Sequence, residues 1–293
     1  MEAEHRRRRL QAERDRLADA TDLMQIDATE YERRISHWNA SATKLRTLIA
    51  STTSSPFDKH HAVAEHALTS SRTLFTCGGC WLYAKYCICS RLTPLNLKTR
   101  LRIHIVCHHK EYARTTSTAI LAATKLGSSC DILLRGYRPH DATLAALCAQ
   151  KSTIILWPAE GSGNAVSYEE VRALLECSPP LHVLVIDGTW SAARKINGKL
   201  DPDIPRLSLP PSEQHSGALA PVRRYRGGRV SRNYCTLEAI GALMCAMGEP
   251  DVAQSLRAAL ELKVAKCLEM NYRGREGRRD GSHRGSDDDI SRS

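Results

Sequence analysis

The sequence lacks any long apolar run and any recognisable secretory signal. No stretch approaches the roughly 20 consecutive apolar residues that a membrane-spanning helix needs, so we expect no membrane span. The N-terminus mixes Arg6–Arg9 with Glu2, Glu4 and Glu13, and no apolar segment follows. This pattern fits neither a secretory signal nor a transit peptide. We therefore expect a cytoplasmic or nuclear protein that is not secreted.

Eleven cysteines in such a chain predict reduced thiols and a metal site rather than a disulfide framework. Four of them, Cys77, Cys80, Cys87 and Cys89, have the spacing C-x2-C-x6-C-x-C. A tight turn through Gly78–Gly79 lets the first pair approach one ion, and the second pair completes a tetrahedron. Four sulfur ligands leave no open position, so the pattern predicts structural zinc. Ordinary buried cysteines are the alternative, and we apply that interpretation to the other seven.

The net charge of +10 at pH 7 favours a polyanionic partner. Residues 1–50 contain ten Lys/Arg against nine Asp/Glu, and residues 271–293 contain six against five, so the excess lies between them. It is densest in an acid-free segment with the arginines Arg223, Arg224, Arg226, Arg229 and Arg232. Such a cluster favours contact with phosphates, and a solvated surface is the alternative.

The order of apolar and polar segments predicts three parts. Residues 1–55 are expected to form a polar helical arm and linker, and residues 271–293 a disordered tail. Between about 74 and 270, short apolar strands alternate with helices. We expect strands at 101–107, 131–134, 153–157 and 181–186, and helices at 117–126, 142–150, 167–176, from 191, at 235–247 and at 252–270. This alternation predicts an α/β fold, a parallel sheet with flanking helices.

Asp187 follows the buried strand 181–186 and precedes Gly188, Thr189 and Trp190. Open α/β sheets bind ligands at the carboxyl ends of their strands. Gly188 permits a close backbone approach, and a helix from Ser191 directs its N–H groups toward the same crevice. The alternative is that Asp187 only caps this helix and Trp190 only packs.

Two other strand ends carry candidate residues. Arg114 lies after the first strand, and its guanidinium can bind a carboxylate or phosphate through two hydrogen bonds. The alternative is that Arg114 is an ordinary surface charge. The neighbouring His108 and His109 are less favoured as metal ligands, because the four cysteines already form a complete ligand set. Trp157 and Pro158 end the third strand, and Glu160 lies in the Gly-rich loop that follows. That loop lacks the Gly-Lys-Ser/Thr ending of a phosphate-cradling loop. Glu160 is a candidate binding residue, and the alternative is that it is only a solvated acid of the loop.

The run Asp187-Gly188-Thr189-Trp190 resembles the signature of the DTW domain family. The cysteine set, Trp157–Glu160 and Cys235–Ala239 resemble the family in the same order, and the resemblance covers about residues 74 to 270. The sequence departs from the family pattern at three positions. Ala159 and Gly161 differ from its usual Pro-Ser-Glu-Asp, and Cys235 stands where the family has Ser.

Members of this family are tRNA-uridine aminocarboxypropyltransferases, related to the SPOUT class of knotted α/β proteins. The resemblance therefore implies a SPOUT-like, knotted sheet, with S-adenosylmethionine as co-substrate and tRNA as partner. It implies transfer of the 3-amino-3-carboxypropyl group to uridine N3, with release of methylthioadenosine. The pattern by itself indicates only a doubly wound sheet, since knots are rare.

The resemblance also implies roles for individual residues. Asp187 is the candidate general base, because uridine N3 must lose its proton before it attacks, and Trp190 would limit solvation of that carboxylate. The alternative is that Asp187 only orients the uridine base or the amine of the co-substrate. Glu238 is a candidate catalytic acid, although its position also fits a capping box with residue 235. The residues expected to bind the co-substrate are Trp157, Pro158, Glu160, Asp187, Gly188, Thr189, Cys235, Thr236 and Leu237. Those expected to bind RNA are Arg114, Arg194, Arg223, Arg224, Arg226, Arg229 and Arg232.

Two other functions stay open at this point. An RNA methyltransferase of the same fold class would present a similar co-substrate pocket. A non-catalytic zinc and RNA-binding module is kept open by the departures at Ala159, Gly161 and Cys235.

Overall fold

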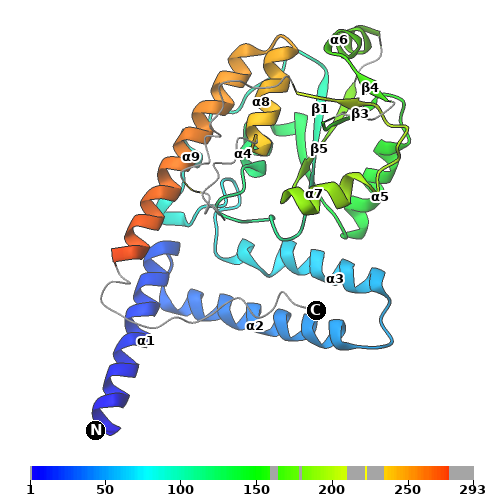
Figure 1. Ribbon diagram of the computed structural model, residues 1–293. Coiled ribbons are helices and arrows are strands. Elements are labelled where there is room, and N and C mark those ends of the chain that lie inside the picture. Colours follow the sequence, from blue (N-terminus) through cyan, green and yellow to red (C-terminus); the bar gives the residue numbers. More distant parts are fainter. Residues whose placement is uncertain (1, 159–163, 178–179, 210–221, 223–233, 277–293) are drawn as a thin grey trace.

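The computed structural model in Figure 1 is an α/β fold in which a twisted sheet lies between layers of helices. The structure describes residues 2–158, 164–177, 180–209, 222 and 234–276. Within these ranges, six parallel strands form one sheet in the order β2-β1-β5-β3-β6-β4. The predicted α/β fold with a parallel sheet and flanking helices is confirmed.

The sheet is centred on the pair β1 and β5, which are buried on both faces and almost wholly apolar. The strands are β1 (Leu101–Cys107), β2 (Cys130–Leu134), β3 (Thr153–Leu156), β4 (Ala165–Val166), β5 (Leu181–Asp187) and β6 (Arg206–Leu207). Cys107 is paired with Asp187, so both central strands end at the same level. The strands β4 and β6 were not predicted, because two residues are too few to show a period.

Side chains of the central strands alternate between two apolar layers. Ile103 and Val183 pack in the larger cluster, together with α4 (Ala119–Leu126), α8 (Thr236–Ala246) and α9 (Pro250–Glu276). Val106 and Leu184 pack on the other face with α5 (Arg138–Cys148) and the end of α7 (Trp190–Asn197). Figure 1 shows these helices on opposite sides of the sheet, with α6 (Tyr168–Cys177) beyond its β4 edge.

Local capping fixes where two helices near the sheet begin. The predicted capping box opens α6: the Ser167 N–H donates to Glu170 at 2.7 Å, and the Glu170 N–H donates to Ser167 Oγ at 3.2 Å. Helix α7 begins at Trp190, because the Thr189 hydroxyl accepts the Ala192 N–H at 3.3 Å.

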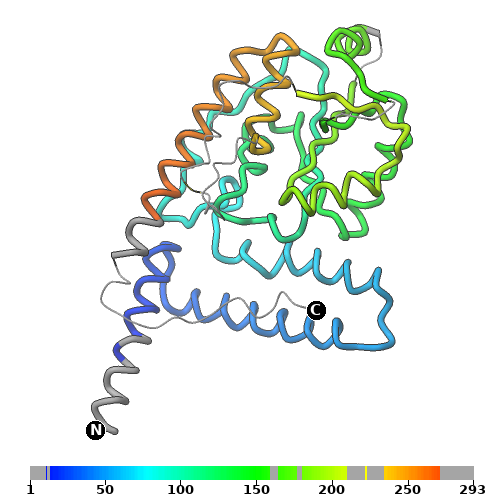
Figure 2. Tube along the Cα trace, in the orientation of Figure 1, coloured from blue at the N-terminus to red at the C-terminus, as the bar shows by residue number. Residues whose placement is uncertain are grey.

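The chain before the first strand is mostly helical. It contains α1 (Glu2–Met24), α2 (Ala28–Ala50) and α3 (Pro56–Thr69), and α2 runs alongside α3 (Figure 2). Helix α3 was not predicted from the sequence. Its Ala64 and Ala67 pack against Cys107 and Leu134, at the carboxyl ends of β1 and β2. Short 3-10 helices lie at η1 (Arg72–Leu74), η2 (Ala84–Tyr86), η3 (Cys89–Arg91) and η4 (Gly127–Ser129).

Some predictions fall outside the described residues. These positions are Glu160, Arg223, Arg224, Arg226, Arg229, Arg232 and the tail from 277 to 293. The knotted topology also stays a prediction. None of the helices in the described ranges combines the length and the apolar character that a membrane crossing requires.

Candidate active site and metal centre

The candidate residues of three strand ends gather at one edge of the sheet. The strands β1, β5 and β3 are neighbours and run parallel, so their carboxyl ends lie side by side. This edge therefore brings together the loop His108–Arg114, the carboxylate of Asp187 and the pair Trp157–Pro158. Open α/β sheets place their ligand sites at such an edge.

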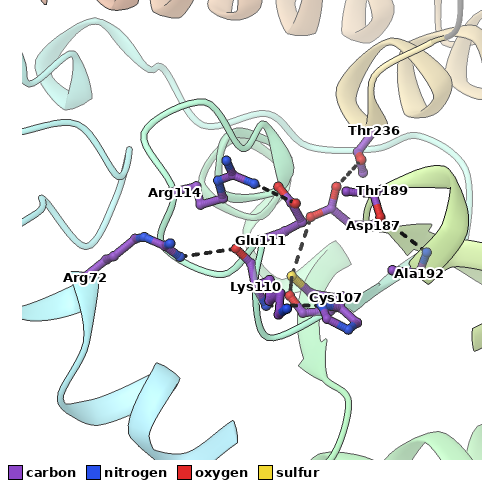
Figure 3. A network of polar contacts seen from close by, with 10 residues as sticks. Arg72, Cys107, Lys110, Glu111, Arg114, Asp187, Thr189, Ala192 and Thr236 are labelled. Carbon is purple, nitrogen blue, oxygen red and sulfur yellow. Dashed lines mark hydrogen bonds and ion pairs between the residues drawn. The ribbon is translucent and has the colours of Figure 1, made fainter. Parts of the chain in front are cut away.

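Asp187 is buried at this edge, with only 8% of its surface exposed. The Thr236 hydroxyl donates to its Oδ1, and the Cys107 thiol donates to its Oδ2 at 3.5 Å (Figure 3). Its backbone carbonyl accepts the His108 N–H at 2.9 Å. Burial, reinforced by the charge of Asp187, raises the pKa of the Cys107 thiol well above its ordinary value. Cys107 therefore remains a thiol donor, and the carboxylate is held in one orientation.

The start of α8 joins the same site. The Leu237 N–H donates to Thr118 Oγ1 at 3.3 Å, while Thr236 is bonded to Asp187. Cys235 occupies the N-cap, and its N–H donates to Glu238 Oε2 at 2.7 Å, which completes a capping box. Burial raises the pKa of the Cys235 thiol to about 12, so this sulfur is a neutral cap at physiological pH. Glu238 thus holds the turn that presents Thr236 to Asp187.

Two tryptophans form an aromatic pair at this edge. The rings of Trp157, after β3, and Trp190, at the start of α7, lie 5.8 Å apart at an interplanar angle of 57°. Trp190 remains 46% exposed, and Arg194, one turn further along α7, is exposed as well. An exposed indole offers a flat apolar surface to a heterocyclic ring.

Gly188 lies where the loop after β1 and the start of α7 approach each other. A Cβ added at Gly188 would stand 3.4 Å from the Ala192 Cβ and 3.5 Å from the His108 Cβ. A side chain larger than a methyl would therefore have to displace one of these neighbours.

Arg72, which was not predicted from the sequence as a site residue, reaches this edge from η1. Its Nη1 donates to the Lys110 carbonyl at 3.2 Å, and Arg114 pairs with Glu111 at 2.8 Å (Figure 3). Burial and the charge of Arg114 lower the pKa of Arg72. No local motif marks Arg72, because its contact is with Lys110, 38 positions further along the chain in the loop after β1.

The histidines after β1 are poor candidates for cationic groups. The rings of His108 and His109 lie 4.3 Å apart. Burial is the main cause that lowers the pKa of both residues, and it brings His109 to about 4. Both imidazoles are therefore neutral at pH 7.

Within the described ranges, Cys77, Cys80, Cys87 and Cys89 form the one group of three or more potential ligands that could hold a metal ion. Their sulfurs all lie within 4.8 Å of one another. The Cys77–Cys89 and Cys77–Cys87 pairs are 3.5 Å apart, and Cys80–Cys87 is 3.8 Å apart. A tetrahedral ion with sulfur at about 2.3 Å separates its ligands by about 3.8 Å, so the cluster has the size that such an ion requires.

The turn between the first two cysteines is shaped to admit the fourth. A Cβ added at Gly79 would lie 2.8 Å from the Cys89 sulfur, whereas one at Gly78 would meet nothing within 4 Å. Thr124 of α4 donates to the Gly79 carbonyl at 2.7 Å and fixes the turn. Glycine is therefore required at the position that touches the sulfur cluster.

The DTW domain family matches residues 74–268, about two thirds of the chain. The chain belongs to the DTW domain family. The match begins just before the cysteine cluster and ends within α9, so it includes the sheet edge around Asp187. Arg72 and α3 lie before it.

Two curated relatives are named tRNA-uridine aminocarboxypropyltransferase 2. The Mus musculus protein is 33% identical over 125 residues, and the Macaca fascicularis protein is 31% identical over 127 residues. In both cases the aligned part covers 41% of this chain and 40% of the relative, so the chain spans about two fifths of the length of each. No solved structure matches the chain.

Proposed function

We propose that this protein transfers the 3-amino-3-carboxypropyl group of S-adenosylmethionine to N3 of a uridine in tRNA and releases methylthioadenosine. The observation that carries the proposal is the position of the DTW motif, with its buried carboxylate and exposed indole at the ligand edge of a parallel sheet. The names of the two relatives support the reaction class. We extend the proposal to the SPOUT-like knotted topology that the family resemblance implies.

The reaction needs a group that removes the proton from uridine N3. Asp187 is the proposed base, since its carboxylate is held in place by Thr236 and Cys107. Once the proton has moved to Asp187, N3 forms a bond to the methylene carbon attached to the sulfonium. The carbon–sulfur bond breaks, and its electron pair stays on the sulfur of methylthioadenosine. The positive charge of the sulfonium is thereby neutralised.

The co-substrate is proposed to lie across the ends of β3 and β5. Trp157 and Trp190 offer the apolar surface for a ring, and Pro158, Gly188, Thr189 and the turn Cys235–Leu237 line the same edge. Glu160 is the proposed partner of the ammonium or ribose hydroxyls. Glu238 stays a candidate catalytic acid in this proposal, and it also holds the turn before α8.

The RNA is proposed to approach over the cationic side chains around this edge. Arg114 and Arg194 are exposed beside the site, and Arg72 adds a third guanidinium. The five arginines of segment 223–232 are proposed to bind phosphates as well. Target uridines in tRNA loops leave their stack at low cost, which suits entry into a pocket.

The four-cysteine cluster is proposed to hold a structural zinc ion. The sulfur spacing and the requirement for Gly79 fit a closed tetrahedral site. Zinc would stabilise the folded turn and leave the chemistry to Asp187 and its neighbours. The division into an arm (1–55), a catalytic domain (74–270) and a tail (271–293) is likewise a proposal, although α9 continues to Glu276, past the predicted start of the tail.

The test is mass spectrometry of tRNA incubated with the protein and S-adenosylmethionine. The proposal expects an adduct on uridine with the mass of an aminocarboxypropyl group, together with methylthioadenosine. A methyl-sized adduct with S-adenosylhomocysteine would instead indicate a methyltransferase. Absence of S-adenosylmethionine binding by zinc-replete protein in calorimetry would indicate a non-catalytic binding module.

A further inference from the structure

Lys263 of α9 is a charged side chain buried in the apolar core. Its exposed fraction is 0%, the lowest among the buried charged residues within the described ranges. A buried ammonium is unfavourable unless it is well hydrogen-bonded, so its partners determine what it does. The position is not explained by the reaction proposed above.

The ammonium of Lys263 connects two segments that are distant in sequence. It donates to the Cys80 carbonyl at 2.7 Å and to the Ser117 carbonyl at 2.6 Å. Cys267, one turn later on the same helix, donates to the Thr115 carbonyl at 3.4 Å. Both of these α9 side chains therefore bind the loop before α4. Only Lys263 also binds the cysteine turn.

The loop fixed by Lys263 leads directly to the candidate active site. Ser117 precedes Thr118, whose Oγ1 accepts the Leu237 N–H at 3.3 Å. Thr236, the neighbour of Leu237, donates its hydroxyl to Asp187. A continuous series of bonded groups thus runs from the Cys80 carbonyl to the Asp187 carboxylate.

The charge of Lys263 suits the occupied cysteine cluster. Four thiolates outweigh the two positive charges of a zinc ion, so the loaded cluster is anionic. A buried cation hydrogen-bonded to the Cys80 carbonyl offsets that charge.

We propose that Lys263 is a positioning residue that couples occupancy of the four-cysteine metal site to the geometry of the S-adenosylmethionine site around Asp187. With zinc bound, the anionic cluster retains the ammonium, and the ammonium retains Ser117 and the Thr118–Leu237 contact. Coupling between two binding sites is reciprocal, so bound S-adenosylmethionine strengthens zinc binding by the same factor. The inference rests on the proposed function for its second ligand.

The experiment measures zinc affinity by equilibrium competition with a chromogenic chelator, with and without saturating S-adenosylmethionine. Wild-type protein is expected to bind zinc about 5-fold or more tightly when S-adenosylmethionine is present, the lower end of typical couplings between sites. Lys263→Met is expected to weaken zinc binding about 10- to 100-fold, the usual effect of losing a partner behind a ligand, and to abolish the enhancement. The matched control is Lys266→Met on the same helix, where the side chain pairs with Glu269 near the surface.

A second variant keeps the inference testable if Lys263→Met does not fold. Thr118→Val preserves the volume of the side chain and leaves the Lys263 contacts in place, but it removes the acceptor of the Leu237 N–H. We expect its zinc affinity without S-adenosylmethionine to equal that of wild type, and the enhancement to shrink.

The outcomes separate this inference from the proposed function. Wild-type protein that binds both ligands without mutual enhancement would overturn the coupling alone. Retained enhancement in Lys263→Met would overturn the role of Lys263. Failure of zinc-replete wild type to bind S-adenosylmethionine would overturn the proposed function and, with it, the coupling. Zinc affinity would still show whether Lys263 supports the metal cluster.

Discussion

The hydroxyl of Thr236, the first residue of α8, donates a hydrogen bond to the carboxylate of Asp187, the last residue of β5. These residues are 49 positions apart in sequence. The bond joins two of the motifs that define the resemblance to the DTW domain family. It places the start of α8 at the ligand edge of the sheet.

Asp187 should matter more for turnover than for folding. Asp187→Asn keeps the shape of the side chain and an oxygen that accepts the Thr236 hydroxyl, but it cannot act as a base at neutral pH. We expect the single-turnover rate of tRNA modification to fall by about 10²–10⁴-fold, with thermal unfolding little changed. Normal turnover in this variant would show that Asp187 is not the general base and serves only as a structural hydrogen-bond acceptor.

Gly79 and Gly78 provide a matched pair for the metal site. Gly79→Ala places a Cβ 2.8 Å from the Cys89 sulfur, whereas Gly78→Ala meets nothing within 4 Å. We expect Gly79→Ala to lower zinc content by metal analysis and to lower the melting temperature, because metal binding contributes to folding. Cys77→Ser and Cys89→Ser should behave likewise. Equal zinc content in both glycine variants would contradict the site geometry.

Arg72 should contribute to RNA binding although it lies before the matched family region. Arg72→Ala is expected to weaken tRNA binding and to reduce the slope of log affinity against log salt by about one, the effect of one lost phosphate contact. The control is Arg257→Ala on α9, where an exposed arginine pairs with Glu261. Filter binding at several salt concentrations makes the comparison. Identical slopes for Arg72→Ala and wild type would show that Arg72 does not contact an RNA phosphate.

Burial of His109 should make stability depend on pH. Its pKa falls from 6.5 to about 4 on folding, chiefly through desolvation. Between these values the unfolded chain binds a proton that the folded chain does not. The contribution of His109 is therefore fully present above pH 6.5 and is lost as the pH falls toward 4. When the pH is lowered from 7 to 5, we expect the melting temperature of His109→Gln to fall by less than that of wild type. Any effect of pH on the cysteines is the same in both proteins. Parallel curves would contradict this assignment.

Strands and helices with a strong local signal were predictable. The strand 101–107 was predicted with the bounds that β1 has, and the Ser167–Glu170 box was predicted where α6 begins. Both have a pattern that is visible within a few neighbouring residues, an apolar run for the strand and a capping sequence for the helix. Helix α3 was missed although its start has a local signal, the Ser55 N-cap followed by Pro56 at the first helical position, because this segment was interpreted as a linker.

The sequence by itself determined the residue types and the local geometry of the candidate site. It predicted a carboxylate at the end of a buried strand, four cysteines at metal-binding spacing and a capping box around Glu238, because each depends on neighbours in the chain. Only the tertiary structure decided which of these segments meet. The Asp187–Thr236 bond, the arrival of Arg72 and the burial of Lys263 between Cys80 and Ser117 depend on the order of strands in the sheet and on helices packed across it. Such long-range contacts have no local pattern, since they form only when the sheet brings distant segments together.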